Sequence, residues 1–237
     1  MILKDIWLDV SAVKERDPAA RSKLEVLLLY QGVHALIWHR FAHWFYQRKM
    51  FFIARLISQL ARFFTQIEIH PGAQMGHGIL IDHGSGVVIG ETTVVGDNCT
   101  IYQGVTLGGV GLNKGKRHPT LGNNVTVGTG AKILGSFEVG DNCTIAANAV
   151  LLKTLESNVT AVGIPARPVK IDGVSLPKKE DNLVTMEHYC KMEERVREME
   201  ETLLKLQEEL SSYREKEIPA QTEASPEERL KEEKTEE

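Results

Sequence analysis

Aliphatic residues recur every six positions through the middle of the chain. An α-helix repeats every 3.6 residues and a β-strand every two, so neither element accounts for this period. A chain that turns a corner every six residues does account for it, because three sides then complete one coil of about 18 residues. The aliphatic side chain of each side points inward and stacks on its copies above and below. The inward positions are Ile69, Met75, Ile81, Ile89, Val95, Ile101, Leu107, Leu121, Val127, Ile133, Val139, Ile145 and Leu151.

An internal repeat gives the length of a coil independently. The segment VGDNCTI occurs at 95–101 and again at 139–145, 44 residues later. Eight of those residues are an insertion, because Leu107 and Leu121 lie 14 positions apart instead of six, and the remaining 36 make two coils. The two copies should therefore lie on the same face, two coils apart. This predicts that Cys99 and Cys143 are small stacked apolar residues and not a catalytic pair.

Residues 1–65 are predicted to form an N-terminal helical domain. Asp17 and Pro18 provide an N-cap and a proline at the first helical position. Residues 34–64 are amphipathic and rich in aromatic side chains, with four arginines among the apolar positions. Two interpretations stay open for this segment. One is a helical bundle that packs on the next domain, which we favour, and the other is a helix that lies at a membrane interface.

The last third of the chain divides into a linker at 171–185, a helix at 186–216 and a tail at 217–237. The apolar residues of the helix alternate spacings of three and four, which is the a/d seam of a coiled coil and favours self-association over a single solvated helix. The tail is acidic and lacks aromatic residues, so we expect it to be disordered. The seam residues are Tyr189, Met192, Val196, Met199, Leu203, Leu206, Leu210 and Tyr213.

Composition and charge narrow the functional classes. The 237 residues, 42% of them apolar, suffice for one core and a modest appendage. The net charge of −4 comes from residues 177–237, which carry 11 Lys and Arg against 19 Asp and Glu, and the rest is too mildly basic for a nucleic-acid binder. The three cysteines form no CxxC motif, and neither a signal-peptide pattern nor a charge-free window of about 18 residues occurs. We therefore expect a soluble, cytoplasmic protein that binds no membrane.

Two clusters carry candidate chemistry. One combines Glu68 with Asp82 and His83, and the other is Arg117 and His118 in the glycine-rich, basic insertion at 110–120. Glu68 and His83 are 15 positions apart, three short of one coil, so they can approach each other between adjacent coils. A carboxylate beside a histidine fixes its tautomer and stabilises the imidazolium, as a general base requires. A purely structural His83 that caps a coil corner is the alternative.

Three stretches resemble bacterial serine O-acetyltransferases: IEIHPGAQMGHGILIDHGSGVVIGET, TLGG with KRHPTLGNNV, and AVGIPARPV. The resemblance covers roughly residues 10–170. It implies an α+β protein in which a helical domain precedes a left-handed parallel β-helix, here at 66–170, and in which three chains assemble. The family moves an acetyl group from acetyl-CoA to the hydroxyl of L-serine, the first step of cysteine synthesis from serine, and uses no metal.

The resemblance also implies roles for particular residues. His83 matches the family's general base, and Glu68 stands where the family has the partner aspartate. Asp17 and Asp82 match the acids that hold the serine amino group. Arg117 pairs with the serine carboxylate, His118 matches a second histidine that contacts the substrate, and the site lies between neighbouring subunits.

The acetyl-CoA side of the site is implied less specifically. Backbone N–H groups of Gly108 and Gly109 are candidate oxyanion donors, because glycine allows close approach. Thr129, Ala131 and Lys132 line up with family coils that border the CoA arm. Lys132 and Arg167 are candidate phosphate ligands, with solvated surface charge as the alternative for both.

The resemblance also implies binding partners, and the residues leave two alternative functions open. L-cysteine is the expected feedback inhibitor, and the expected assembly is a homotrimer or higher. The chain ends in Glu236-Glu237 rather than the family's C-terminal isoleucine, so we expect no complex, or a weak one, with cysteine synthase. A hexapeptide acetyltransferase with a sugar or homoserine acceptor is the alternative function. A γ-type carbonic anhydrase, with zinc on His70, His77 and His83, is a more distant one.

Overall fold

The computed structural model describes residues 2–111, 114–177 and 186–217. Two compact units divide near residue 178, one with helices α1–α4 and strands β1–β16 and the other with helix α5, and each is described by itself. The end of the expected linker, 178–185, and the expected acidic tail from residue 218 onward lie outside the described residues.

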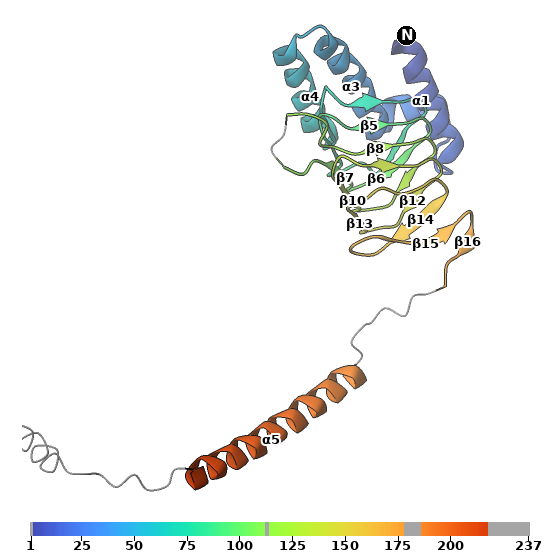
Figure 1. The fold of residues 1–237 in the computed structure, drawn as a ribbon. Helices are drawn as coiled ribbons and strands as arrows, with labels where there is room; N and C mark the ends of the chain where they lie inside the picture. The colour runs from blue at the N-terminus through green and yellow to red at the C-terminus, as the bar shows by residue number, and fades with distance from the viewer. Residues whose placement is uncertain (1, 112–113, 178–185, 218–237) are drawn as a thin grey trace, which may run out of the picture. The chain divides into compact units, whose positions relative to one another are not determined.

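Helices α1, α3 and α4 cover the first coil of the N-terminal unit, and α2 packs on α1 and α3 (Figure 1). Helices α1 and α3 contact strand β3, and α4 contacts β1. Where α3 meets β3, a Cβ on Gly32 would lie 2.1 Å from the carbonyl oxygen of Ile81, so only glycine permits this approach. The helices therefore pack on the next domain, as the bundle interpretation predicts. They are α1 (Ile2–Arg16), α2 (Lys23–Leu29), α3 (Gln31–Gln47) and α4 (Phe51–Thr65).

Polar contacts fix α1 against α3 and the coils. Arg40 Nη2 lies 2.6 Å from Asp9 Oδ2, and both side chains are buried. Burial raises the pKa of Asp9, and the Arg40 guanidinium opposes that rise. At the end of α1, Arg16 donates to the carbonyl oxygen of Asn98 at 2.8 Å and to the Thr100 hydroxyl at 3.0 Å. These bonds fix the position of the residue that follows α1, which is Asp17.

Helix α4 packs inward with its small residues, contrary to what its apolar stripe suggests. Ala54, Ser58, Ala61 and Thr65 are buried, while Phe52 is 82% exposed. Small side chains allow the helix to lie close to its neighbours, so the large apolar side chains are left on the outer face. That face comprises Phe51, Phe52, Ile53, Leu56, Leu60, Phe63 and Phe64.

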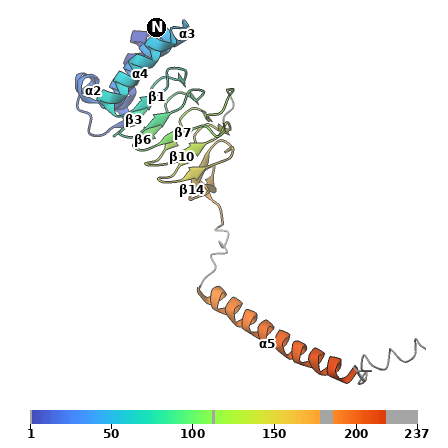
Figure 2. The same ribbon diagram turned by 90° about the vertical axis from the view of Figure 1, so that its left-hand side faces the viewer.

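The coils form a three-sided parallel β-helix, as predicted (Figure 2). Sheet A contains β1-β4-β7-β10-β13, sheet B contains β2-β5-β8-β11, and sheet C contains β3-β6-β9-β12-β14, which β15 and β16 extend in antiparallel fashion. Of the thirteen predicted inward residues, all but the partly buried Met75 are buried. The strands are β1 (Glu68–Ile69), β2 (Gln74–Met75), β3 (Leu80–Asp82), β4 (Val88–Ile89), β5 (Val94–Val95), β6 (Thr100–Tyr102), β7 (Thr106–Gly108), β8 (Thr120–Leu121), β9 (Thr126–Val127), β10 (Lys132–Leu134), β11 (Glu138–Val139), β12 (Thr144–Ile145), β13 (Val150–Leu151), β14 (Val159–Val162), β15 (Arg167–Ile171) and β16 (Val174–Ser175).

The corner between sheets B and C confirms the internal repeat. Cys99 and Cys143 are both buried there, each just before a strand of sheet C and two coils apart. Burial raises the pKa of Cys99 to about 11, so its thiol stays protonated. Asparagines with positive φ turn this corner, and their side chains form a ladder in which Asn124 donates to Asn142 at 3.1 Å and Asn142 to Asn158 at 2.9 Å.

Helix α5 (Met186–Glu217) forms where the heptad pattern predicts a helix. Its described apolar side chains are all exposed. Among the described residues, no helix combines the length and the apolarity that crossing a membrane requires.

Candidate active site

The predicted site residues divide between two corners of the β-helix, one at each edge of sheet A. Asp82 ends β3 of sheet C, and His83 begins the turn from β3 to β4 of sheet A, at what we call the acidic corner. Arg117 and His118 lie between β7 of sheet A and β8 of sheet B, at what we call the basic corner. Within one chain, sheet A separates the two groups.

The acidic corner is longer at His83 than in the next coil. Glu68 in β1 pairs with Val88 in β4, which makes this first coil 20 residues long, and five residues separate β3 from β4. Only three separate β6 from β7. The two additional residues carry His83 outward, with φ at 56° and three quarters of its side chain exposed. Its Nε2 lies 3.9 Å from Asp82 Oδ1.

Helices α2 and α3 bring Asp17 to the same corner. The Tyr30 hydroxyl donates to Asp17 Oδ2 at 2.7 Å, and the neighbouring Gln31 donates from Nε2 to the carbonyl oxygen of His83 at 2.8 Å. The bond to Asp17 raises the pKa of Tyr30 to about 12, and the charge of Asp82 adds to the effect. Two carboxylates and the His83 imidazole therefore gather around the start of α3. The sequence pattern does not single out Tyr30 or Gln31.

Glu68 has other partners in this structure. Its Oε1 lies 3.2 Å from Arg55 Nη2 and its Oε2 lies 3.0 Å from Arg62 Nη1, so two guanidinium groups of α4 compensate its charge. Glu68 and His83 form no ion pair with each other among the described residues. The hydrogen bond between Glu68 and His83 that the spacing suggested is therefore not formed here, and the role of Glu68 stays a prediction.

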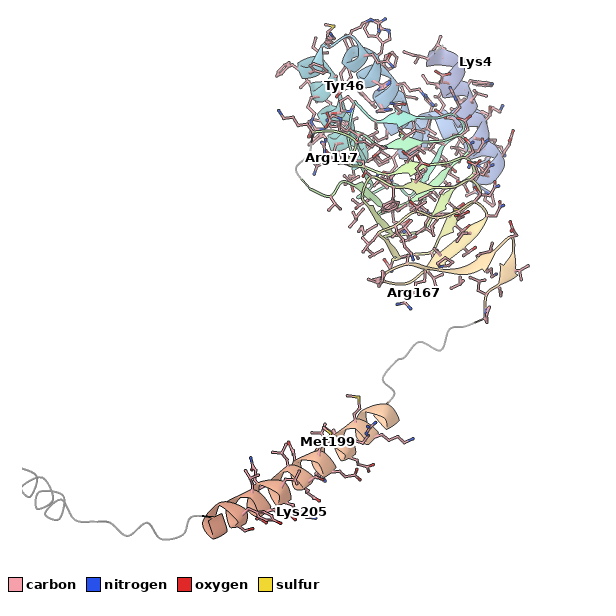
Figure 3. All side chains as sticks on the ribbon, viewed as in Figure 1. Lys4, Tyr46, Arg117, Arg167, Met199 and Lys205 are labelled. Atoms are coloured by element: carbon pink, nitrogen blue, oxygen red, sulfur yellow. The ribbon has the colours of Figure 1, made fainter. Side chains whose placement is uncertain are left out.

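Glu91 organises the basic corner by joining Arg117 to Tyr46 of α3, and Figure 3 labels these two partners near the same end of the coils. Arg117 Nη2 lies 2.5 Å from Glu91 Oε2, and the Tyr46 hydroxyl of α3 donates to Glu91 Oε1 at 3.1 Å. The bond from Arg117 lowers the pKa of Glu91, and the bond from Tyr46 assists. Arg117 is thus held in one orientation by an ionised carboxylate. Neither Glu91 nor Tyr46 was found from the sequence, although Glu91 lies within the quoted IGET segment.

Thr92 sets the tautomer of His118. Its hydroxyl oxygen accepts the backbone N–H groups of Arg117 at 3.0 Å and His118 at 3.1 Å, and it lies 2.9 Å from His118 Nδ1. The Thr92 backbone N–H donates to the same Nδ1 at 3.2 Å, so that nitrogen is an acceptor. Burial and the Arg117 charge lower the pKa of His118, which keeps the ring neutral. A neutral ring that accepts at Nδ1 carries its proton on Nε2 and can donate from there.

Glycines make room for the His118 ring. A Cβ on Gly90 would lie 1.9 Å from His118 Cδ2, and one on Gly109 would lie 3.2 Å from His118 Nε2 and 2.9 Å from Arg117 Cγ. Gly108 ends β7 immediately before Gly109. Of the two glycines predicted to supply oxyanion donors, Gly109 therefore lies beside Nε2 of His118, whereas Gly108 faces Leu134 and Thr106.

The other predicted CoA residues lie elsewhere. Thr129 and Lys132 are at the same edge of sheet A as His83, two coils along, where Lys132 donates to the carbonyl oxygen of Gly104. Ala131 is fully buried, so its side chain belongs to the core. Its backbone N–H donates to the carbonyl oxygen of Gly128, and its carbonyl oxygen accepts the N–H of Thr106. Arg167 begins β15 beyond the parallel coils.

A cavity of about 340 Å³ lies next to the basic corner, beneath α3 and α4. Burial lowers the pKa of His70 in its wall, and His70 Nδ1 accepts the Gly72 N–H at 3.0 Å. Its lining residues are Tyr46, Phe51, Arg55, His70, Pro71 and Glu91.

The histidines of the zinc alternative do not converge in one chain. His70 follows β1, His77 follows β2 and His83 follows β3, so each lies at a different corner. Within the described ranges, no three His, Cys, Asp or Glu side chains gather as a metal site would require. The geometry thus gives no support to the zinc alternative.

Comparisons with known proteins agree with this architecture. Residues 1–37 match the family description "Serine acetyltransferase, N-terminal", and residues 118–153 match "Bacterial transferase hexapeptide (six repeats)". A serine acetyltransferase of Helicobacter pylori is 60% identical over 168 residues, which is 71% of this chain and 98% of that protein. One of Bacillus pumilus is 48% identical over 217 residues, which is 92% of this chain and 99% of that protein.

Solved structures give the same result. The crystal structure of Neisseria gonorrhoeae serine acetyltransferase matches with a TM-score of 0.70 and 39% identity, over 71% of this chain and 67% of that one. The soybean enzyme in complex with serine matches with a TM-score of 0.69 and 40% identity, over 71% and 69% of the two chains. With these identities and this fold, the chain belongs to the serine acetyltransferase family.

Proposed function

We propose that this protein is an acetyl-CoA-dependent serine O-acetyltransferase. The observation that carries the proposal is the separation of charge between the two corners of sheet A, with acids and an exposed histidine at one and Arg117 with a neutral His118 at the other. L-Serine is a zwitterion, so a site that binds it needs both signs of charge. A sugar acceptor has neither charge.

The reaction needs a base, an oxyanion site and a leaving group. His83 accepts the hydroxyl proton of serine while that oxygen attacks the thioester carbonyl. The new O–C bond forms, the C–S bond breaks, and CoA leaves as a thiolate that takes up a proton. The Nε2–H of His118 and the N–H groups of Gly108 and Gly109 are the proposed donors to the oxyanion, and the contact of the His118 ring with Gly109 supports this proposal.

Binding of the substrate follows from the charges. Asp17 and Asp82 hold the ammonium group and Arg117 holds the carboxylate. Tyr30 fixes Asp17, and Glu91 fixes Arg117, so both ligands are oriented before serine arrives. Glu68 is the proposed second carboxylate of the base, and it would have to leave Arg55 or Arg62 to reach His83. L-Cysteine carries the same two charges and is the proposed competing inhibitor.

The complete site requires two copies of the chain. In one chain the acidic and basic corners lie at opposite edges of sheet A, so a serine bound at one corner does not meet the other. In a trimer, the acidic corner of one copy can face the basic corner of the next, which gives three equivalent sites. Thr129, Lys132 and Arg167 are the proposed ligands of acetyl-CoA. Because acetyl-CoA is an intracellular metabolite, we infer a cytoplasmic location.

The decisive experiment follows the loss of thioester absorbance with purified protein, acetyl-CoA and L-serine. We expect turnover that depends on serine and falls by at least about 100-fold in His83→Ala. L-Homoserine and a sugar serve as comparison acceptors. Faster turnover with either acceptor than with serine would overturn the proposed substrate, and full activity of His83→Ala would overturn the proposed base.

A further inference from the structure

Helix α5 carries an apolar seam that its own chain leaves exposed. The seven described seam residues run from Met192 to Tyr213, and their exposed fractions range from 48% to 67%. At 32 residues the helix is about 48 Å long. Helices in proteins are stabilised chiefly by the packing of an apolar face. An apolar seam of this length therefore calls for a partner helix.

The charges beside the seam identify the partner. With the heptad a positions at Val196, Leu203 and Leu210, Arg195 falls at a g position and Glu200 at an e position. In a parallel, in-register coiled coil, a g residue faces the e residue that lies five positions later in the neighbouring chain. Arg195 would thus face Glu200 of a second copy.

The same complement recurs two heptads further along, after the uncharged pair of Thr202 and Gln207. The sequence has Glu209 at a g position and Arg214 at the following e position, which is the same pairing with the signs exchanged. An antiparallel alignment that pairs the two ends of the seam would instead set Arg195 beside Thr202 and Glu200 beside Gln207, with no ion pair. The pattern is therefore complementary to a parallel copy of itself.

We propose that α5 helices from three copies of this chain form a parallel, in-register coiled coil that holds the catalytic trimer together. The β-branched a residues that favour a two-stranded coil are confined to Val196, because leucine occupies the a positions at Leu203 and Leu210. The number three also rests on the trimer of the proposed function. Since each complete site takes residues from two copies, joining the copies through α5 raises their effective concentration and keeps the sites assembled on dilution.

Disulfide trapping in the full chain tests the register. Leu206 is a d-position residue and Leu204 lies off the seam, yet both are 58% exposed, so Leu204 is a matched control. In a Cys190→Ser background, Leu206→Cys chains should form disulfide-linked pairs at least about tenfold faster than Leu204→Cys chains when diamide is added. Two thiols give up two protons and two electrons, and diamide is reduced to the hydrazine. Equal rates would overturn the coiled coil, and fast linking only between a Val196→Cys chain and a Leu206→Cys chain would show an antiparallel pair.

Sedimentation of the full chain tests the energetic role. Leu203→Glu should raise the concentration at which the assembly half-dissociates by about tenfold or more, while Leu204→Glu should leave it unchanged. Arg195→Glu should weaken the assembly, and the exchange Arg195→Glu with Glu200→Arg should restore it. No difference between the two leucine variants would overturn the proposal. None of these measurements uses serine or acetyl-CoA, so their failure is distinguishable from failure of the proposed reaction.

Discussion

The contact between Gly90 and the His118 ring gives the sharpest prediction. A methyl group at Gly90 would lie 1.9 Å from His118 Cδ2, whereas ordinary contact begins near 3.4 Å. In Gly90→Ala the ring must therefore move by roughly 1.5 Å, or the coil that carries Gly90 must shift. The backbone of Gly90 has no positive φ, so alanine is otherwise compatible with this position.

The size of the displacement sets the size of the effect. A misplacement of about 1 Å in a catalytic group can cost about 100-fold in rate, which corresponds to about 2.7 kcal/mol in the transition state. We therefore expect kcat/KM for serine to fall by about 100-fold in Gly90→Ala. Gly115→Ala is the control, because nothing lies within 4 Å of a Cβ at that glycine.

A double-mutant cycle isolates the contact. His118→Ala removes the ring that the new methyl group strikes, so Gly90→Ala added to His118→Ala should lower kcat/KM and the unfolding temperature no further. Thioester assays and thermal unfolding supply the two readouts. Gly90→Ala with wild-type kcat/KM, or a double variant much worse than His118→Ala alone, would refute the reasoning.

Three further predictions follow from the same structure. Glu91→Gln removes the charge that orients Arg117, so KM for serine should rise by about tenfold with a smaller change in kcat. Steady-state kinetics at varied serine concentration measure both constants, and an unchanged KM would show that Glu91 does not orient Arg117. Burial lowers the pKa of His39 to about 3, so below about pH 6.5 the unfolded state binds a proton at this histidine and the folded state does not. The free energy of unfolding should therefore fall by up to about 1.4 kcal/mol per pH unit toward pH 4. Urea titrations of the His39→Met variant should show a smaller decline. Of the three thiols, only Cys190 is exposed, so a thiol-specific chromophoric reagent at pH 8 should modify one thiol per chain rapidly and three after unfolding; two rapid thiols would contradict the stacked core.

The residues of the acidic corner show how far spacing arguments reach. A uniform coil of 18 residues places Glu68 close to His83, but the first coil has 20 residues, and its two extra residues lie at the corner that carries His83. The count from one strand to the next fixes which coil a residue belongs to. The direction of its side chain at a corner depends on the local turn, and the sequence period contains no information about that turn.

The sequence pattern also does not predict which side chains from distant segments contact the site residues. Tyr46 reaches Glu91 from α3, Tyr30 reaches Asp17 from the end of α2, and Arg55 reaches Glu68 from α4. Such contacts depend on how the helices dock on the first coil. That docking rests on the buried Asp9–Arg40 pair and on small inward residues, which carry no periodic signal.

The sequence by itself determined the β-helix, its inward residues and the stacking of Cys99 on the same face as Cys143. It could do so because each side of a coil must bury an apolar side chain at a fixed interval, and this interval is visible as the six-residue period of the sequence. Its motifs also indicated the family and the principal charged residues. Only the tertiary structure decided that Asp82 and Arg117 lie at opposite edges of one sheet, because a residue's corner depends on the accumulated lengths of all preceding turns. From that placement comes the need for a second copy, since no single chain brings both charges to one substrate.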